Sequence, residues 1–348
     1  MASTTTMKQW VVRSDKNDLD GMVFVDAPVP QVGENDVLVK LRSAALNYRD
    51  VAIPKGKFLL PYKLPVVPAS DGAGEVVEVG SRVSKWKKGD RIITLFNQGH
   101  QYGPVDPVVA ATGLGGTIDG TLRQYGVFNE NGVVRAPGNL SFAEASTLTG
   151  APLTSWNALY GLRPLKAGET VLVQGTGGVS ISALQLAKAG GAKVIATTSS
   201  SEKAEKLKEL GADHVINYKE NPEWGSIARK LTHNESGVDH ILEVGGFGTF
   251  TQSLKAVKYE GIITLIGFLG GNSGEAPPSA LDALTSMCTI RAIYVGSKAQ
   301  MEEMVAAYEN NDIHPVVDSK LFSLEQAKEA FEYLGAQKHI GKVCVQIE

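Results

Sequence analysis

Cysteine is scarce in this sequence, which contains only Cys288 and Cys344. Two thiols cannot build a disulfide framework, and such scarcity is typical of a reducing compartment. The opening residues MASTTTMKQW have neither the basic region nor the apolar region of a secretory signal. Apolar runs such as GIITLIGFLGG are much too short to span a membrane. We therefore expect a cytoplasmic protein without a membrane partner.

An excess of charge of one sign is also lacking. The chain has 34 Lys and Arg against 37 Asp and Glu, a net charge of −3. It thus has neither the basic surface that nucleic acid requires nor an acidic tail, and a small-molecule substrate is the expected partner. With 348 residues, 43% of them hydrophobic, the chain is long enough for two domains with substantial cores.

The first 140 residues or so consist of short β-type runs separated by glycine and proline. DVLVKLRSAALN, GAGEVVEVG and DRIITLF are rich in Val and Ile and predict strands of a small barrel or sandwich. Residues 96–120 are rich in Gly and Pro and have no period, which predicts a long loop. His100 lies in this segment, and we expect it to be solvated rather than to bind a metal.

From residue 141 onward the pattern becomes helical and then alternates. Ser141 and Glu144 form a capping box that predicts a helix through residue 162. A second box, Ser323 with Gln326, predicts a helix that ends at Gly335, before a last strand at 341–348. In between, six apolar segments alternate with helical ones and predict a doubly wound parallel sheet. These segments are 170–174, 193–198, 214–217, 238–245, 261–268 and 289–296.

The turn after the first of these strands has the spacing of a dinucleotide-binding loop. It reads GTGGVS and is followed by a helical segment, so that backbone N–H groups and the helix dipole would face a pyrophosphate. Ser180 replaces the third glycine, and its hydroxyl either bonds back to a carbonyl or faces the cofactor. The alternative is a plain structural turn. The predicted contacts are Gly175, Thr176, Gly177, Gly178, Val179 and Ser180.

The next strand decides which cofactor we expect. An NAD site needs an acidic residue about 20 positions after the glycines. The sequence instead offers Thr198, Ser199 and Ser200, followed by Lys203. Hydroxyl groups and a cation suit the 2′-phosphate of NADP(H), although Lys203 could equally be a solvated helix lysine.

Taken together, these segments resemble the medium-chain dehydrogenase/reductase superfamily over nearly the whole chain. The resemblance rests on LNYRD (46–50), DGAGEVVEVG (71–80), KKGDRI (87–92), LVQGTGGVS (172–180), LGADHVINY (210–218) and HIGKV (339–343). It implies an α/β protein with a GroES-like β-rich catalytic domain at 1–149 and 298–348. It also implies a six-stranded Rossmann NADP-binding domain at 150–297, with the active site between the two domains.

The same resemblance bears on zinc. Zinc-dependent members carry Cys at the position of Asn47, Gly-His-Glu at positions 69–71 and a further Cys near Gly150. This sequence has Asn47, Ala69-Ser70-Asp71 and Gly150 there, and Asn, Ser and Gly do not form a zinc ligand set. We therefore expect no metal. The chain resembles the zinc-independent quinone oxidoreductase and enoyl reductase branch, which is alcohol dehydrogenase-like.

The resemblance also implies further cofactor contacts. They are Tyr48, Thr154, Tyr218, Gly245, Gly267, Phe268, Leu269, Gly341 and Lys342. Ordinary strand-end packing is the alternative for Tyr218, and a place in the core is the alternative for Phe268 and Leu269.

Without a metal, the expected substrate is one that is already activated by conjugation. Hydride would pass to an enone, an enoyl group or a quinone, and the enolate would need hydrogen-bond donors and a proton. The candidate catalytic residues are Asn47, Tyr48, Asp50 and Tyr125, with Lys55 as a weaker donor. Asp50 either holds its loop through hydrogen bonds or forms a surface pair with Arg49.

Two other functions stay open: a zinc-free alcohol dehydrogenase or carbonyl reductase, and a non-enzymatic cofactor-binding sensor. A homodimer is expected through the exposed edge strand near 289–297. A stand-alone enoyl reductase that serves a polyketide synthase is a special case of the first function.

Overall fold

The computed structural model describes residues 6–268 and 279–348. The chain forms two compact units, one of Met1–Leu153 with Gly296–Glu348 and one of Thr154–Val295. The domain boundaries predicted from the sequence lie at 149/150 and 297/298, near these divisions.

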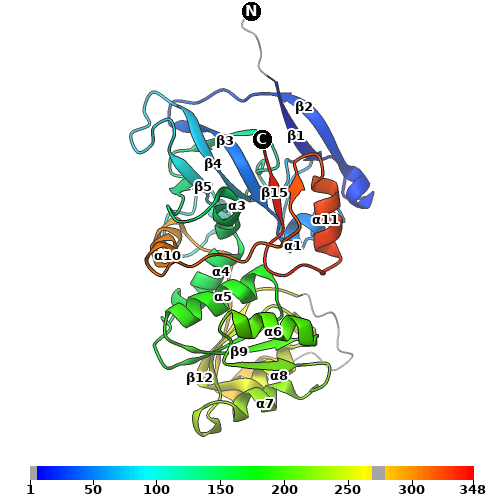
Figure 1. Cartoon of the computed structure of the whole chain (residues 1–348), viewed down its shortest axis with the longest axis vertical. Coiled ribbons are helices and arrows are strands. Elements are labelled where there is room, and N and C mark those ends of the chain that lie inside the picture. The colour runs from blue at the N-terminus through cyan, green and yellow to red at the C-terminus, as the bar shows by residue number, and fades with distance from the viewer. Residues whose placement is uncertain (1–5, 269–278) are drawn as a thin grey trace, which may run out of the picture. The chain divides into compact units, whose positions relative to one another are not determined.

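The second unit contains a six-stranded parallel sheet (Figure 1). Its strand order is β10-β9-β8-β11-β12-β13, the order of a doubly wound sheet in which ligands bind at the carboxyl ends of the strands. The prediction of six parallel strands is therefore confirmed. The strands are β8 (Thr170–Gln174), β9 (Lys193–Thr198), β10 (His214–Asn217), β11 (Val238–Glu243), β12 (Val257–Leu265) and β13 (Thr289–Ala292).

Five helices of this unit connect these strands. They are α5 (Gly178–Ala189), α6 (Ser201–Glu209), α7 (Trp224–Lys230), α8 (Phe250–Ala256) and α9 (Ala280–Ser286). One core cluster of the unit is built from Leu172, Ile195, Ile241 and Ile263, which are all at most 1% exposed. These residues come from the four inner strands β8, β9, β11 and β12, because strands that are covered on both faces are apolar on both sides.

Strand β13 is shorter than expected. The predicted segment runs to residue 296, whereas the strand ends at Ala292. Its only neighbour in the described part of the sheet is β12, and the last pair of that ladder is Leu265 with Ala292. Ile293 N still donates to Leu265 O at 3.4 Å, and β12 itself ends at Leu265.

The first unit is mostly antiparallel β structure, as predicted. Its large sheet has the order β14-β15-β3-β4-β5-β7, with β6 paired to β3, and a separate sheet pairs β1 with β2. The strands are β1 (Thr6–Val12), β2 (Met22–Pro28), β3 (Asp36–Ala45), β4 (Asp71–Val79), β5 (Arg91–Thr94), β6 (Tyr125–Asn129), β7 (Val133–Arg135), β14 (Phe322–Ser323) and β15 (Cys344–Gln346). The core includes Leu41, Ile92 and Phe331.

Two helical predictions need correction. The helix expected from residue 142 to 162 is interrupted: α3 (Phe142–Ser146) and a short 3₁₀ turn end at Gly150, and α4 (Ala151–Tyr160) begins after it. The segment 96–120 is not entirely a loop, because it contains the short helix α2 (Pro107–Ala110). The carboxylate of Asp106 caps α2 by accepting a hydrogen bond from Val109 N at 2.8 Å.

The other helices of the first unit are α1 (Tyr48–Ala52), α10 (Lys298–Asn310) and α11 (Ala327–Gly335). Helix α11 ends at Gly335 as predicted but starts after Gln326, since Ser323 belongs to β14. The predicted box bond is present, because Gln326 Oε1 accepts from Ser323 N at 3.1 Å.

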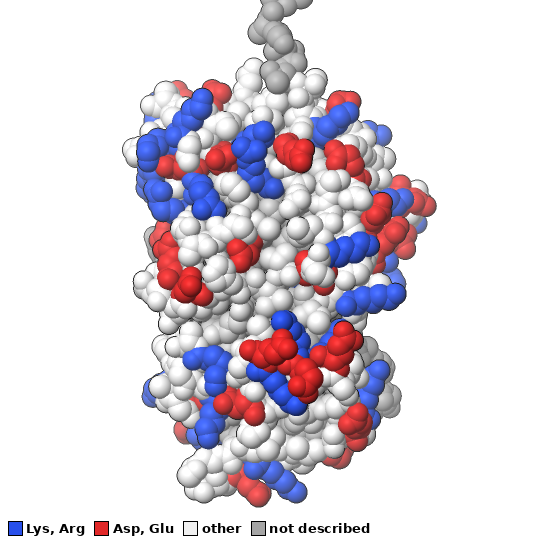
Figure 2. Space-filling view, viewed as in Figure 1, with Lys and Arg blue, Asp and Glu red and all other residues white. Residues whose placement is uncertain are grey.

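Lys and Arg side chains gather at the upper left of the face shown in Figure 2, on the first unit, with acidic side chains among them. In the described residues, no helix has both the length and the apolar character that crossing a membrane requires.

Candidate active site

Polar residues after β3, at the start of β4 and before β15 form a largely buried group in the first unit, which we call the Asn47 cluster: Asn47, Asp50, Ser70, Asp71 and Lys342. Asn47 stands at the start of α1, and its backbone N–H donates to Asp50 Oδ2 at 2.8 Å. The structure thus shows Asp50 holding its loop. A surface pair with Arg49 is not formed, because Asp50 is fully buried and Arg49 Nη1 donates to Leu114 O at 2.8 Å.

Burial changes the acidity of Asp50. Desolvation raises the pKa of this carboxyl from 3.8 to about 6, and the nearby charges of Arg49 and Lys342 only partly oppose the shift. Its second oxygen, Oδ1, is buried and has no hydrogen-bond partner in the described chain. Asp50 is therefore a side chain whose protonation changes near neutral pH.

Lys342 supplies the positive charge of the cluster. Its side chain is 5% exposed, and its ammonium donates to Leu46 O at 2.8 Å, Asn47 Oδ1 at 2.5 Å and Asp71 Oδ2 at 3.1 Å. These three acceptors use the three N–H bonds of the ammonium. They also fix the Asn47 amide with its oxygen toward Lys342 and its NH₂ group on the other side.

Asp71 begins β4 and is completely buried. Its carboxylate accepts from Ser70 Oγ at 2.7 Å and from Gly150 N at 3.2 Å. A Cβ added at Gly150 would lie 2.9 Å from Asp71 Oδ1. The break in the predicted helix at residue 150 follows from this contact, since the Gly150 N–H points to a carboxylate.

The Asn47 cluster does not fit a zinc ion. The positions that correspond to zinc ligands in zinc-dependent proteins hold Asn47, Ser70 and Gly150. In addition, the Lys342 ammonium lies within hydrogen-bond distance of both Asn47 and Asp71. A metal cation would have to displace Lys342 from these oxygens. In residues 6–268 and 279–348, no group of three or more His, Cys, Asp and Glu side chains is arranged to hold a metal.

His100 is not solvated, contrary to the expectation. It is 4% exposed, and its Nε2 lies 2.9 Å from Gly103 O. The imidazole therefore holds the turn at residues 100–103 together.

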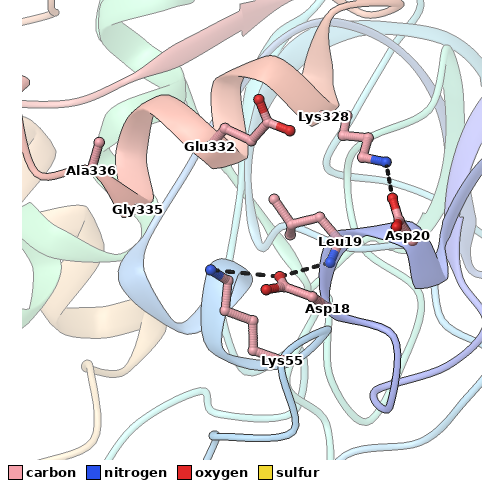
Figure 3. Close-up of a pocket in the computed structure, with 8 residues that line it drawn as sticks. All are labelled: Asp18, Leu19, Asp20, Lys55, Lys328, Glu332, Gly335 and Ala336. Carbon is pink, nitrogen blue, oxygen red and sulfur yellow. Dashed lines mark hydrogen bonds and ion pairs between the residues drawn. The ribbon is translucent and has the colours of Figure 1, made fainter.

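The other candidates of the first unit lie at different points. The Tyr48 side chain is 39% exposed at the start of α1. Tyr125 begins β6 opposite Lys40, whereas Asn47 follows the far end of β3. Lys55 faces a separate hollow, where its ammonium lies 3.5 Å from Asp18 Oδ1 (Figure 3).

Gly341 precedes Lys342 in a tight backbone contact. Its φ is +74°, and a Cβ there would lie 2.1 Å from Val316 O. Only glycine can therefore occupy this position without moving the chain that delivers the Lys342 side chain. The roles of Tyr48, Tyr125, Gly341 and Lys342 toward a cofactor stay predictions.

In the second unit, the GTGGVS turn connects β8 to α5 in the manner expected of a phosphate-binding loop. Gly175 has φ +78°, and Cβ atoms added at Gly175 or Gly177 would meet no described atom within 4 Å. A ligand could therefore come close to the backbone at both glycines. Ser180 is buried, and its hydroxyl donates to Gln174 O at 2.6 Å. Of the two expected orientations of Ser180, the bond back to a carbonyl is the one observed.

Hydroxyl groups end the neighbouring strand β9. Thr198 is 1% exposed, and its Oγ1 is buried without a hydrogen-bond partner in the described chain. Ser200 caps α6 by accepting from Lys203 N at 3.3 Å. The Tyr218 side chain is 41% exposed, and its backbone N–H donates to Thr198 O at 3.0 Å.

A buried carboxylate organises the loop that follows β11. Glu243 Oε1 accepts from Gly245 N at 3.0 Å, Gly246 N at 2.9 Å and Thr249 Oγ1 at 2.5 Å. Its Oε2 accepts from Gln174 Nε2 at 2.8 Å and Ser253 Oγ at 2.5 Å. These five donors replace the water that a carboxylate would otherwise bind.

Close packing surrounds the remaining strand-end glycine. A Cβ at Gly267 would lie 2.7 Å from Val244 O. Phe268 is 43% exposed, which excludes a fully buried core position for it, and Thr154 is 7% exposed on α4. Leu269 lies outside the described residues. Cofactor contacts at these positions stay predictions.

Two features of the site were not predicted from the sequence. Lys342 and Asp71 are 271 residues apart, and nothing local in either segment signals the pair. Glu243 did leave a signal, an acidic residue at the end of the apolar segment VDHILE. A buried charge in such a position requires partners.

Comparison with known proteins identifies the family. Residues 33–138 match the alcohol dehydrogenase GroES-like domain, and residues 178–310 match the zinc-binding dehydrogenase model. The chain is 44% identical to a zinc-type alcohol dehydrogenase-like protein of Schizosaccharomyces pombe, over 98% of this chain and 99% of that protein. It is 33% identical to the 2-methylene-furan-3-one reductase of Solanum lycopersicum, over 97% of this chain and 79% of the reductase.

Solved structures agree with these matches. A Sinorhizobium meliloti 1021 structure described as a proposed alcohol dehydrogenase superimposes with a TM-score of 0.90 at 38% identity, over 100% of both chains. An NAD-dependent alcohol dehydrogenase superimposes with a TM-score of 0.87 at 32% identity, over 98% of this chain and 100% of the other. The chain therefore belongs to the medium-chain dehydrogenase/reductase superfamily, whose members are oxidoreductases that use a nicotinamide cofactor.

Proposed function

We propose that this protein is an NADP(H)-dependent oxidoreductase that reduces an activated C=C bond or a quinone without a metal. The observation that carries the proposal is the Lys342 ammonium, which donates to Asn47 Oδ1 at 2.5 Å and to Asp71 Oδ2 at 3.1 Å. A protein that holds an ammonium there has no Lewis acid to polarise a plain alcohol or ketone. A substrate that is already polarised by conjugation does not need one, which favours an enone, an enoyl group or a quinone.

Asn47 is the group that we assign to the substrate oxygen. Because its Oδ1 accepts from Lys342, its NH₂ group remains as the donor, and its contact with Ser70 Oγ is a long one at 3.5 Å. A fixed donor stabilises the negative charge that develops on an enolate oxygen. Lys342 acts as a positioning residue for Asn47, since its own N–H bonds are already used.

NADP(H) supplies the hydride in this proposal. The turn at Gly175–Ser180 would hold the pyrophosphate, because N–H groups at the start of α5 favour an anion. The end of β9 would hold the 2′-phosphate. The lack of any carboxylate before Glu202 in the segment that follows supports this assignment.

Cofactor titration followed by a substrate panel tests the proposal. We expect NADPH to bind at least tenfold more tightly than NADH, and Lys203→Met to reduce this preference. Lys206→Met is the matched control, since Lys206 lies on the same helix and pairs with Glu209 at 3.0 Å. With bound NADPH, we expect consumption with an enone and a quinone but not with a plain aldehyde.

Tighter binding of NADH, or equal loss of preference in both lysine variants, would contradict the NADP(H) assignment. Faster turnover with the aldehyde would support the second candidate, a zinc-free alcohol dehydrogenase or carbonyl reductase. That candidate is favoured by the alcohol dehydrogenase names of the S. pombe and S. meliloti proteins, whereas the tomato reductase favours the first.

A further inference from the structure

A hollow in the first unit, apart from the Asn47 cluster, has the size and lining of a ligand site. It lies between the loop after β4, the turn between β6 and β7, and α10, and its volume is about 710 Å³. This is within the range of small-molecule sites, ~300–1,000 Å³. The charged and aromatic groups that line it include Lys85, Trp86, Tyr102, Arg135, Lys298 and Glu302.

Two lysine side chains of this hollow donate hydrogen bonds to the same asparagine. Lys85 Nζ donates to Asn131 Oδ1 at 2.7 Å, and Lys298 Nζ donates to Asn131 O at 3.1 Å. Neither ammonium lies within 4.0 Å of a carboxylate in residues 6–268 and 279–348. Because an ammonium carries three N–H bonds, each has donors beyond the one that Asn131 accepts.

Lys298 is buried, and burial makes an unpaired positive charge unfavourable. It is the first residue of α10 and is 8% exposed, and desolvation lowers the pKa of its ammonium. A buried cation is normally paired with an anion. The lining has three cationic side chains and the carboxylate of Glu302. Arg135 also pairs with Asp90 at 3.9 Å, and Glu130 acts on Lys298 from outside the lining, which leaves the Lys85 and Lys298 ammonium groups without a direct ion pair. The hollow therefore favours an anion.

The other hollow of this unit provides a contrast. Its lining also contains two lysines, but each is paired with an acid: Lys328 with Asp20 at 2.5 Å and Lys55 with Asp18 at 3.5 Å (Figure 3). Both of its lysines are therefore paired within the protein. The two hollows therefore differ in this respect: the lysines of the hollow near Asn131 have no carboxylate within 4.0 Å among the described residues.

Aromatic rings form the apolar part of the lining near Asn131. The Trp86 ring is held in place because its Nε1 donates to Glu130 O at 2.8 Å. The Arg135 guanidinium lies 5.7 Å from the Trp86 ring centroid. Tyr102 is 81% exposed, which is unusual for so large a ring, and it lines the same hollow. A flat apolar body would cover these rings and exclude water from them.

We propose that this hollow binds a small organic anion, with its acid group on Lys85 and Lys298 and a planar apolar body against Trp86 and Tyr102. None of the residues that line it is one that we assign to the cofactor or the substrate oxygen. It does not depend on the function proposed above.

Calorimetric titration with 2-naphthoate, in the presence of saturating NADPH, tests the site. We expect one saturable site in the wild-type protein that weakens with added salt, and at least tenfold weaker binding of the uncharged 2-naphthol. Lys298→Met should weaken naphthoate binding at least tenfold and Lys298→Arg should largely retain it. Lys328→Met, a lysine of the paired hollow, should change nothing.

Lys85→Met provides a second test that does not disturb a buried residue, and we expect it to weaken binding several-fold. Trp86→Phe should remove most of the quenching of tryptophan fluorescence by naphthoate. Absence of a saturable site in the wild-type protein would refute the proposal. So would equal binding by the wild type, Lys298→Met and Lys85→Met.

Discussion

Asp50 is enclosed by protein, and its charge has no ion-pair partner within 4.0 Å in the described chain. Its pKa is about 6 in the folded protein because of burial, whereas an unfolded chain would return it to ~3.9. When folding raises the pKa of a carboxyl, its contribution to the stability of the folded state is largest at pH values below the pKa of the unfolded chain. This contribution is lost as the pH rises through the folded pKa.

Asp50→Asn removes this titration while the side chain keeps an oxygen for the Asn47 N–H. Relative to the wild type, the variant should gain unfolding free energy as the pH rises from 4 to 7, by up to about 3 kcal/mol. Urea unfolding at pH 4, 5, 6 and 7 measures the difference. Asp26→Asn is the control, since Asp26 is exposed and pairs with Lys8. A difference that is constant with pH would show that Asp50 has an ordinary pKa.

Single residues were predictable where local chemistry decides the outcome. For Ser180 and Asp50, residue type and spacing left two alternatives each, and in both cases the observed one is a bond within the local segment. Lys342 was predicted to contact the cofactor, and its three bonds to Leu46, Asn47 and Asp71 were not foreseen. Those bonds depend on how β15 returns beside β3, which no local pattern contains.

At the scale of elements, the predictions hold for the presence of the strands and fail at helix and strand boundaries that distant groups determine. Buried strands of a parallel sheet are recognisable because they are apolar along their whole length. The helix break at Gly150 depends instead on Asp71, which accepts from its N–H at 3.2 Å. The end of β13 likewise depends on where β12 ends.

At this scale we predict that the loop after β11 depends on Glu243, which accepts five hydrogen bonds there. In Glu243→Gln, the new NH₂ group would face donors such as Gln174 Nε2, and at least one buried donor would lose its acceptor. We expect unfolding free energy to fall by roughly 1–3 kcal/mol, and NADPH binding to weaken if Gly245 contacts the cofactor. Thermal unfolding and NADPH titration provide the two measurements.

Glu223→Gln is the matched control for the loop, because Glu223 is exposed on the same unit and pairs with Lys255 at 2.6 Å. It should change neither quantity. If Glu243→Gln is as stable as the wild type, the network around Glu243 does not contribute to folding.

At the scale of the whole molecule, the fold class could be predicted because the two units have different sequence patterns. Alternating β-type runs with glycine turns fill the first unit, and apolar strands alternating with helices fill the second. The family follows from the same segments. The oligomeric state is harder to predict, because an edge strand in a sequence indicates unpaired backbone groups but not which partner covers them.

Strand β13 carries the last prediction, that the protein is a homodimer. In the described part of the chain β13 has one strand neighbour, β12, so that its other side presents unpaired backbone groups. Apolar side chains lie nearby in sequence, since Leu281, Leu284 and Met287 are each more than half exposed. Light scattering should give a mass of two chains of 37.0 kDa.

Ala292→Lys tests whether β13 forms this interface. Ala292 is exposed at the end of the strand, and a lysine there would place like charges close together across a pair of twin strands. We expect the variant to have the mass of one chain with an unchanged melting temperature. His214→Lys is the control at the opposite edge, on β10, and should remain dimeric. A monomeric wild type would disprove the dimer, whereas a dimeric Ala292→Lys variant would place the interface on another surface.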